Sequence, residues 1–173
     1  MYSAQDVVPA VRADSELEDP NPLAKLFMDR VAGETFSQDK ARDTIIPAYM
    51  GLITQIDDQI GVLFDFMEQR GLLDDTMIVF TSDHGDYLGD HWMGDTDYFH
   101  APGVQIPLII ADPDRRAEKT RGTVDDSLVE LIDLLPTFVD FCGGEPPQNI
   151  LDGRSLMPLL RGENPDWRSF AVS

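Results

Sequence analysis

All three histidines of this 173-residue chain lie between Thr81 and His100. The same stretch holds five aspartates and no Lys or Arg. These histidines and aspartates are His84, His91, His100, Asp83, Asp86, Asp90, Asp95 and Asp97. Carboxylate oxygens and imidazole nitrogens together are suitable ligands for divalent metals such as Mn²⁺, Zn²⁺ or Fe²⁺. The stretch therefore indicates a metal site, although an acidic surface loop that contains imidazoles would have the same composition.

Asp83 and His84 are the first candidates for metal ligands. They follow the apolar run from Met77 to Phe80, which is typical of a strand buried on both faces in a parallel sheet. Ligands in open α/β sheets bind at the carboxyl ends of such strands. Neighbouring side chains point to opposite faces of a strand, but Gly85 allows a turn that aims both at one point. We predict that Asp83 and His84 are metal ligands, with a hydrogen-bonded loop pair as the alternative.

His91 and His100 have two interpretations from their sequence surroundings. His91 precedes Trp92 and Met93, and His100 follows Phe99. An imidazole among large apolar side chains is more often packed than catalytic. A direct role of either histidine at a site is the second interpretation.

The surrounding pattern predicts an α/β arrangement. Apolar residues recur every three or four positions from Ser37 to Arg70, which predicts one long helix with Pro47 near its start and Gly71 as its C-terminal cap. The strand over 77–80 follows, and the apolar run 104–111 predicts a second core strand, with Pro107 at an edge or bulge. Two or three strands are too few for a stable open sheet, so we expect a partner sheet from elsewhere.

The remaining segments are predicted from their prolines, glycines and charges. Residues 1–22 form an extended lead-in, because three prolines exclude a regular helix there. A short helix from Pro22 to Arg30 is broken at Gly33. The basic segment 112–122 is a surface loop. Asp133 is expected to cap a helix over 134–142, and a further short helix is expected over 155–160.

Composition excludes several classes of function. The formal charge is −19 and the apolar fraction is 42%, so the chain is globular and has no basic surface for nucleic acid or for an anionic membrane. The single cysteine excludes an internal disulfide and cysteine-rich zinc sites. The sequence shows neither a transmembrane run nor a signal peptide, which favours the cytoplasm.

Several blocks together resemble a known family. They are the helix ending in GLLDDTMIVFTSDHGDYLGDH, then VQIPLII, then IDLLPTFVDFCGG, and finally DGRSLMPLL. In this order they resemble the C-terminal half of the catalytic region of sulfatases and phosphonate monoester hydrolases, in the alkaline phosphatase superfamily. The resemblance runs from about Val7 to Val172.

The resemblance implies a doubly wound α/β sheet with helices on both faces, of which residues 1–173 hold the C-terminal portion. It implies hydrolysis of a small sulfate, phosphate or phosphonate ester with a divalent metal and a formylglycine or related nucleophile. Asp83 and His84 match the family's late pair of metal ligands. Many sulfatases carry Asp-Asn there, so Asp-His favours the phosphonate or phosphodiester branch. It also favours a metal such as Mn²⁺. Ca²⁺ is the other leading candidate for the metal, with Zn²⁺ and Mg²⁺ as further candidates.

Two departures from the family limit this expectation. The nucleophile motif and the first acidic ligands belong to an N-terminal half that is absent here, so no catalytic residue is predicted and the isolated chain is expected to be inactive. Thr96 stands where the family commonly has a Lys that contacts the ester, and no Lys occurs from Thr81 to Glu118. Thr96, His91 and His100 are predicted substrate contacts, with His100 as a substitute donor.

Three alternatives for the function remain. The chain is the C-terminal part of a metal-dependent ester hydrolase, or a decayed or split relative that acts through a partner. An acidic metal-binding module unrelated to hydrolysis is the third. Because half a sheet exposes an apolar edge, we expect self-association or a complementing N-terminal chain.

Overall fold

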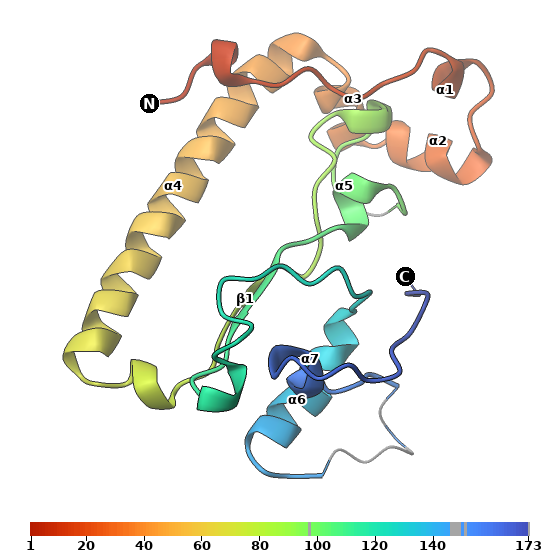
Figure 1. Ribbon diagram of the computed structural model, residues 1–173. Coiled ribbons are helices and arrows are strands. Elements are labelled where there is room, and N and C mark those ends of the chain that lie inside the picture. The colour runs from red at the N-terminus through yellow and green to blue at the C-terminus, as the bar shows by residue number, and fades with distance from the viewer. Residues whose placement is uncertain (97, 146–149, 151, 173) are drawn as a thin grey trace. The chain divides into compact units, whose positions relative to one another are not determined.

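The computed structural model describes residues 1–96, 98–145, 150 and 152–172. The chain divides into two compact units. Unit 1 comprises Met1–Arg70 and Ser82–Pro107, and unit 2 comprises Gly71–Thr81 and Leu108–Ser173. Figure 1 shows the course of the chain through its helices and strands.

The described residues of unit 1 form five α-helices, four of which are short. They are α1 (Ser15–Glu18), α2 (Pro22–Met28), α3 (Val31–Phe36), α4 (Asp39–Gln69) and α5 (Ala101–Val104). The Asn21 side chain caps α2 by accepting a hydrogen bond from the Leu23 amide. The helix near Pro22 is confirmed, but Gly33 does not break it, because α2 ends at Met28 and Gly33 lies inside α3.

The first 22 residues are not extended throughout, which corrects the sequence interpretation. A single 3₁₀ turn forms at Ala4–Asp6, where Ser3 and Asp6 make a reciprocal capping box. Helix α1 forms one further turn between Pro9 and Pro20. Prolines exclude a long helix in such a segment but permit single turns between them.

The long helix α4 is confirmed, with Pro47 inside it and Gly71 at a φ of 65° just after its last turn. Arg42 is the one buried residue in α4, all of which the structure describes. Large apolar side chains along α4 are exposed, and they are Ile45, Tyr49, Leu52, Ile53, Ile56, Val62, Leu63, Phe64 and Phe66. The apolar stripe is therefore present but remains accessible. The small core of unit 1 lies elsewhere, where Ala24, Tyr87 and Met93 pack with Phe27, Met28 and Tyr98.

Unit 2 contains the sheet. Strands β1 (Ile78–Thr81) and β2 (Leu108–Ala111) pair antiparallel, with Ile78 opposite Ala111 and Thr81 opposite Leu108. Both predicted strands exist, but their pairing corrects the expected parallel sheet. The second strand is also shorter than predicted, because Val104 ends α5 and Pro107, which has no amide proton to donate, precedes the strand. Phe80 is 43% exposed, so β1 is not buried on both faces.

Unit 2 also contains helices α6 (Leu134–Phe141) and α7 (Met157–Leu160). Their bounds agree closely with the helices predicted over 134–142 and 155–160. Asp133 occupies the N-cap position of α6, but its side chain makes no cap hydrogen bond. Its carboxylate accepts hydrogen bonds from the backbone amides of Glu130 and Arg154 and pairs with Arg168. A fully buried carboxylate needs such partners. The Asp133 side chain bonds to them instead of capping α6.

These elements confirm the α/β class, with a two-stranded sheet in the part of the chain that the structure describes. None of the helices in those described ranges is long and apolar enough to cross a membrane.

Candidate functional site

Asp83 and His84 converge at the start of the segment that we call the histidine loop (residues 82–100). The Nε2 atom of His84 lies 3.6 Å from Oδ2 of Asp83. The other carboxylate oxygen, Oδ1, accepts a hydrogen bond from the His84 amide at 3.0 Å. The side chains of Asp83 and His84 are 83% and 53% exposed. The predicted turn therefore brings both groups to one accessible point.

The carbonyl group of Gly85 determines which ring nitrogen of His84 carries the proton. Nδ1 of His84 lies 2.9 Å from the Gly85 carbonyl oxygen. Because a carbonyl only accepts hydrogen bonds, Nδ1 carries the proton, and Nε2 of the neutral ring keeps its lone pair toward Asp83. A metal-bound histidine commonly donates its second N–H group to such a carbonyl.

The charges around this pair shift three pKa values. Hydrogen bonds from the backbone amides of Asp83 and His84, followed by the charge of His84, lower the pKa of the Asp83 carboxyl. The hydrogen bond to Gly85, aided by Asp83, Asp86 and Asp95, raises the pKa of His84. Burial, reinforced by Asp95, raises the pKa of Asp86. The surroundings are thus negative, which suits a cation.

The donor set fits a divalent metal, although it is incomplete. Two ligands about 2.1 Å from one cation lie about 3 to 3.5 Å apart at tetrahedral or octahedral angles, close to the separation of Asp83 and His84. The described ranges contain no group of three or more His, Cys, Asp and Glu side chains placed to hold a metal. Asp83 and His84 would supply two ligands, and the others must come from outside these residues.

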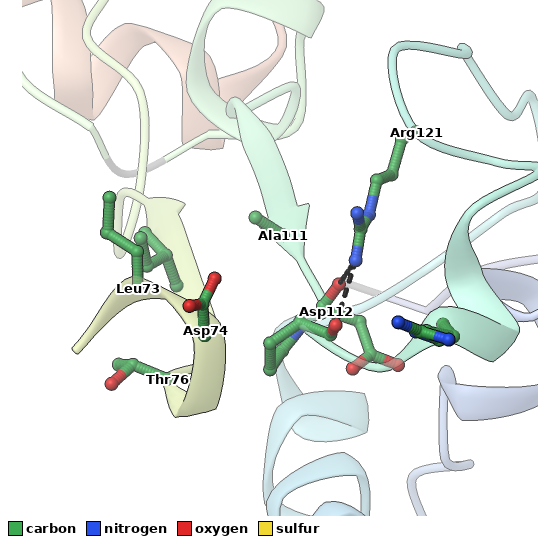
Figure 2. A pocket seen from close by; sticks show the side chains of 9 residues that line it. Leu73, Asp74, Thr76, Ala111, Asp112 and Arg121 are labelled. Carbon is green, nitrogen blue, oxygen red and sulfur yellow. Dashed lines mark hydrogen bonds between the residues drawn. The ribbon is translucent and has the colours of Figure 1, made fainter. Parts of the chain in front are cut away.

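An open pocket in unit 2 contains neither Asp83 nor His84. It has a volume of about 650 Å³ and is lined by Leu73, Asp74, Thr76, Ile78, Ala111, Asp112, Pro113, Arg115 and Arg121. Figure 2 shows Arg121 directed at the backbone beside Asp112, where it donates to the carbonyls of Asp112, Pro113 and Asp114. The Asp112 side chain is buried and bonds the Asp114 amide. This arrangement holds a surface loop in place.

Gly85 is required by close backbone packing. A Cβ atom at this position would lie 1.8 Å from the Pro102 carbonyl oxygen, and the Gly85 amide donates to the Gly103 carbonyl at 2.9 Å. Helix α5 therefore rests on the backbone directly after His84. The turn that Gly85 was predicted to allow is accompanied by a contact that no larger residue permits.

The other predicted site residues form a second group. His91 and His100 stack, with ring centroids 3.9 Å apart and an interplanar angle of 21°. Nδ1 of His91 lies 2.6 Å from a carboxylate oxygen of Glu16. Thr96 is half-buried, and its carbonyl lies beside Gly103. The described contacts bring His91 and His100 together, and these contacts do not include Asp83 or His84.

The histidine loop has an unusual backbone that two arginines hold. Leu88, His91, Trp92 and Asp95 have φ values between 46° and 69°, a left-handed conformation that strains side chains of this kind. Arg42 donates to the Leu88 carbonyl at 2.8 Å.

The second arginine is Arg12, which donates to the carbonyls of Gly89 and Phe36. Its guanidinium also lies over the Trp92 ring at 4.7 Å. The contacts of Arg12, Arg42 and Glu16 with the histidine loop were not predicted, because no local sequence pattern indicates them.

Comparison with known proteins identifies relatives over the whole chain. The sulfatase family model matches residues 17–144. A multifunctional alkaline phosphatase superfamily protein, PehA of Trinickia caryophylli, is 36% identical over 98% of this chain and 35% of its own length. An arylsulfatase of Clostridium perfringens is 36% identical over 71% of this chain and 25% of its own length.

Two solved structures have the same fold. A phosphonate monoester hydrolase from Silicibacter pomeroyi superposes with a TM-score of 0.81 at 34% identity, over 97% of this chain and 34% of that one. The enzyme of the same class from Agrobacterium radiobacter gives 0.85 at 29% identity, over 96% and 35%. The chain thus spans about a third of the length of these relatives. The chain belongs to the sulfatase family, within the alkaline phosphatase superfamily.

Proposed function

We propose that this chain supplies two metal ligands, Asp83 and His84, to a hydrolase of sulfate, phosphate or phosphonate esters. The supporting observation is the 3.6 Å separation of Asp83 Oδ2 and His84 Nε2, with Nδ1 fixed by the Gly85 carbonyl. Family membership supports the reaction class, because relatives are arylsulfatases and phosphonate monoester hydrolases. Within that class the Asp-His pair and the similarity to two phosphonate monoester hydrolases favour phosphonate or phosphodiester substrates.

The roles of the side chains follow from their chemistry. The Asp83 carboxylate carries negative charge, and His84 offers a neutral nitrogen whose direction the Gly85 carbonyl sets. Asp83 and His84 would hold a divalent metal, Mn²⁺ or Ca²⁺ by preference, which would supply Lewis-acid polarisation of an ester oxygen and stabilisation of negative charge. His91, His100 and Thr96 remain proposed substrate contacts. The contact between Glu16 and His91 supports an oriented imidazole rather than a mobile one.

Metal titration of the isolated chain tests the ligand assignment. We expect weak binding of Mn²⁺ by calorimetry, because two ligands alone hold a cation poorly, and negligible hydrolysis of aryl sulfates or phosphonate esters. Asp83→Asn and His84→Gln should each remove the binding. Asp125→Asn makes the same change of charge at an exposed loop position and serves as the control.

Two outcomes would contradict this assignment. Equal Mn²⁺ affinity in the Asp83→Asn, His84→Gln and wild-type chains would place the cation elsewhere. Hydrolysis by the wild-type chain that disappears in Asp83→Ala would show that the chain by itself holds more of the active site than two ligands.

A second candidate function is a non-catalytic one, exercised through a partner. It is favoured by Thr96 at the position of the family's Lys and by the acidic surroundings of His84, which repel an ester dianion. Under either candidate we propose that the chain associates, with a second copy or with a polypeptide that carries the rest of a sulfatase domain. The exposed apolar side chains of α4 and β2 support this proposal.

A further inference from the structure

His100, which stacks on His91, lies in surroundings that favour a neutral ring. The rings of Tyr87 and Tyr98 approach His100 with centroids at 5.9 and 5.1 Å. The Tyr87 hydroxyl accepts a hydrogen bond from the His100 amide at 3.0 Å. His100 is thus enclosed mainly by aromatic rings, which solvate a positive charge less well than water does.

Only one of the two imidazoles has a partner for a positive charge in the described part of the chain. Glu16 lies 2.6 Å from Nδ1 of His91. Nδ1 of His100 is buried and has no hydrogen-bond partner among the described residues. A proton on this atom would be a buried donor without an acceptor in the described part of the chain. Its charge would face the His91 ring, whose centroid lies 3.9 Å from that of His100.

In the described part of the chain, the carboxylate of Glu16 is the one that hydrogen-bonds either ring. The other described titratable or charged groups in contact with the stack or with the residues beside it are Asp90, Arg12, Tyr87 and Tyr98. The histidine loop also carries Asp83, His84, Asp86 and the exposed Asp95. Asp90 accepts the Val11 amide, and Arg12 lies over Trp92. The residues that α2 packs into this core are uncharged, and they are Ala24, Phe27 and Met28.

The stack is directly joined to the start of α5. His100 is the N-cap residue of this helix, and its carbonyl accepts the amides of Gly103 and Val104. Gly103 in turn accepts the amide of Gly85, and a Cβ atom on Gly103 would lie 3.2 Å from the Tyr87 ring. A shift of His100 away from His91 would therefore lift α5 from Gly85 and Tyr87.

We propose that the His91–His100 stack is a pH-sensitive latch, closed while His100 is neutral and opened when His100 takes up a proton, and that opening releases α5 from Gly85 and Tyr87.

The sign of the effect follows from the surroundings of His100. Burial, and then the charge of His91, lowers its pKa below the ordinary value of 6.5, while Glu16 acts in the opposite direction. Since the open state binds the proton more readily than the closed state, the closed state is fully favoured above pH 6.5. It is lost progressively as the pH falls below that value.

Amide hydrogen exchange, followed by NMR and corrected for intrinsic rates, tests the latch. We expect protection of the His100, Gly103 and Val104 amides to fall between about pH 7.5 and pH 5, by about tenfold for each unit that separates the closed and open pKa values of His100. Amides inside α4 serve as the internal reference. The imidazole resonances of His100 should titrate below the ordinary value.

Two variants separate the latch from a general effect of acid. His100→Phe keeps a stacking ring that cannot be charged, so the three amides should keep their protection at low pH. His84→Gln removes an exposed imidazole outside the stack and should leave the pH response intact. Protection that does not change with pH in the wild-type chain, or a His100 titration at or above its ordinary pKa, would overturn the proposal. If His100→Phe does not fold, these two wild-type measurements decide alone.

Discussion

The Arg42 side chain alone connects several segments of unit 1. Its guanidinium is buried, and it donates to the carbonyls of Leu88 and Val8 at 2.8 and 2.9 Å. These bonds join three segments of unit 1: helix α4, the N-terminal arm (residues 7–14) and the histidine loop. Strain in the left-handed residues of the loop must be offset by such contacts.

Replacing Arg42 by Met should therefore destabilise the chain by about 2 kcal/mol, because the carbonyls of Leu88 and Val8 both lose their charged donor. Lys40→Met removes the same charge from an exposed position two residues earlier in α4 and should change the stability by less than about 0.5 kcal/mol. Urea unfolding followed by circular dichroism measures both variants. Equal stability of the two variants would show that the Arg42 clamp does not hold the loop.

Contacts between neighbouring residues could be predicted from the sequence, whereas contacts between distant residues could not. Convergence of Asp83 and His84 was predictable, because it needs only a turn at the neighbouring Gly85. The contacts of Arg42 with Leu88 and of Glu16 with His91 join residues 46 and 75 positions apart. A single sequence has no local signal for such pairs.

At the scale of helices and strands, local sequence patterns predicted the elements themselves but not how the strands pair. The long helix was predicted because a 3.6-residue apolar period and a terminal glycine are both local properties. The antiparallel pairing of β1 with β2 was not, since strand direction depends on the path of the 26 residues assigned to unit 1 between Thr81 and Leu108. An apolar run indicates a strand but carries no information about its partner.

Replacing a glycine by alanine should have opposite effects on stability at two positions, one inside α4 and one just after it. Gly71 has a φ of 65°, and an added Cβ there would meet no atom within 4 Å, so Gly71→Ala should cost about 1 kcal/mol through backbone strain alone. Gly51, inside the helix, has the same open space, and Gly51→Ala should stabilise the chain by about 0.5 to 1 kcal/mol. Thermal unfolding compares the two variants. A gain in stability for both would mean that Gly71 does not act as the helix cap.

At the scale of the whole molecule, charge and apolar exposure oppose each other. A formal charge of −19 keeps copies apart, while the exposed side chains of α4 favour burial against another surface. Salt screens the first effect and leaves the second nearly unchanged.

Raising the salt concentration from about 0.05 M to about 0.5 M should therefore increase association, as measured by light scattering. The double variant Leu52→Asp, Ile56→Asp places charge on the exposed stripe and should reduce association at both salt concentrations. Asp57→Asn, on the same helix, is the control and should not reduce it. A monodisperse monomer under all conditions would contradict self-association through α4.

The division of the chain also has a consequence for its synthesis on the ribosome. Unit 1 has all its residues once Pro107 has emerged, whereas β1 must wait for Leu108–Ala111 before it can pair. During that interval the nascent chain presents Ile78, Val79 and Phe80 as an apolar strand without a neighbour, which is a target for chaperones and for aggregation. Slow translation of the codons just before Leu108 would prolong this exposure.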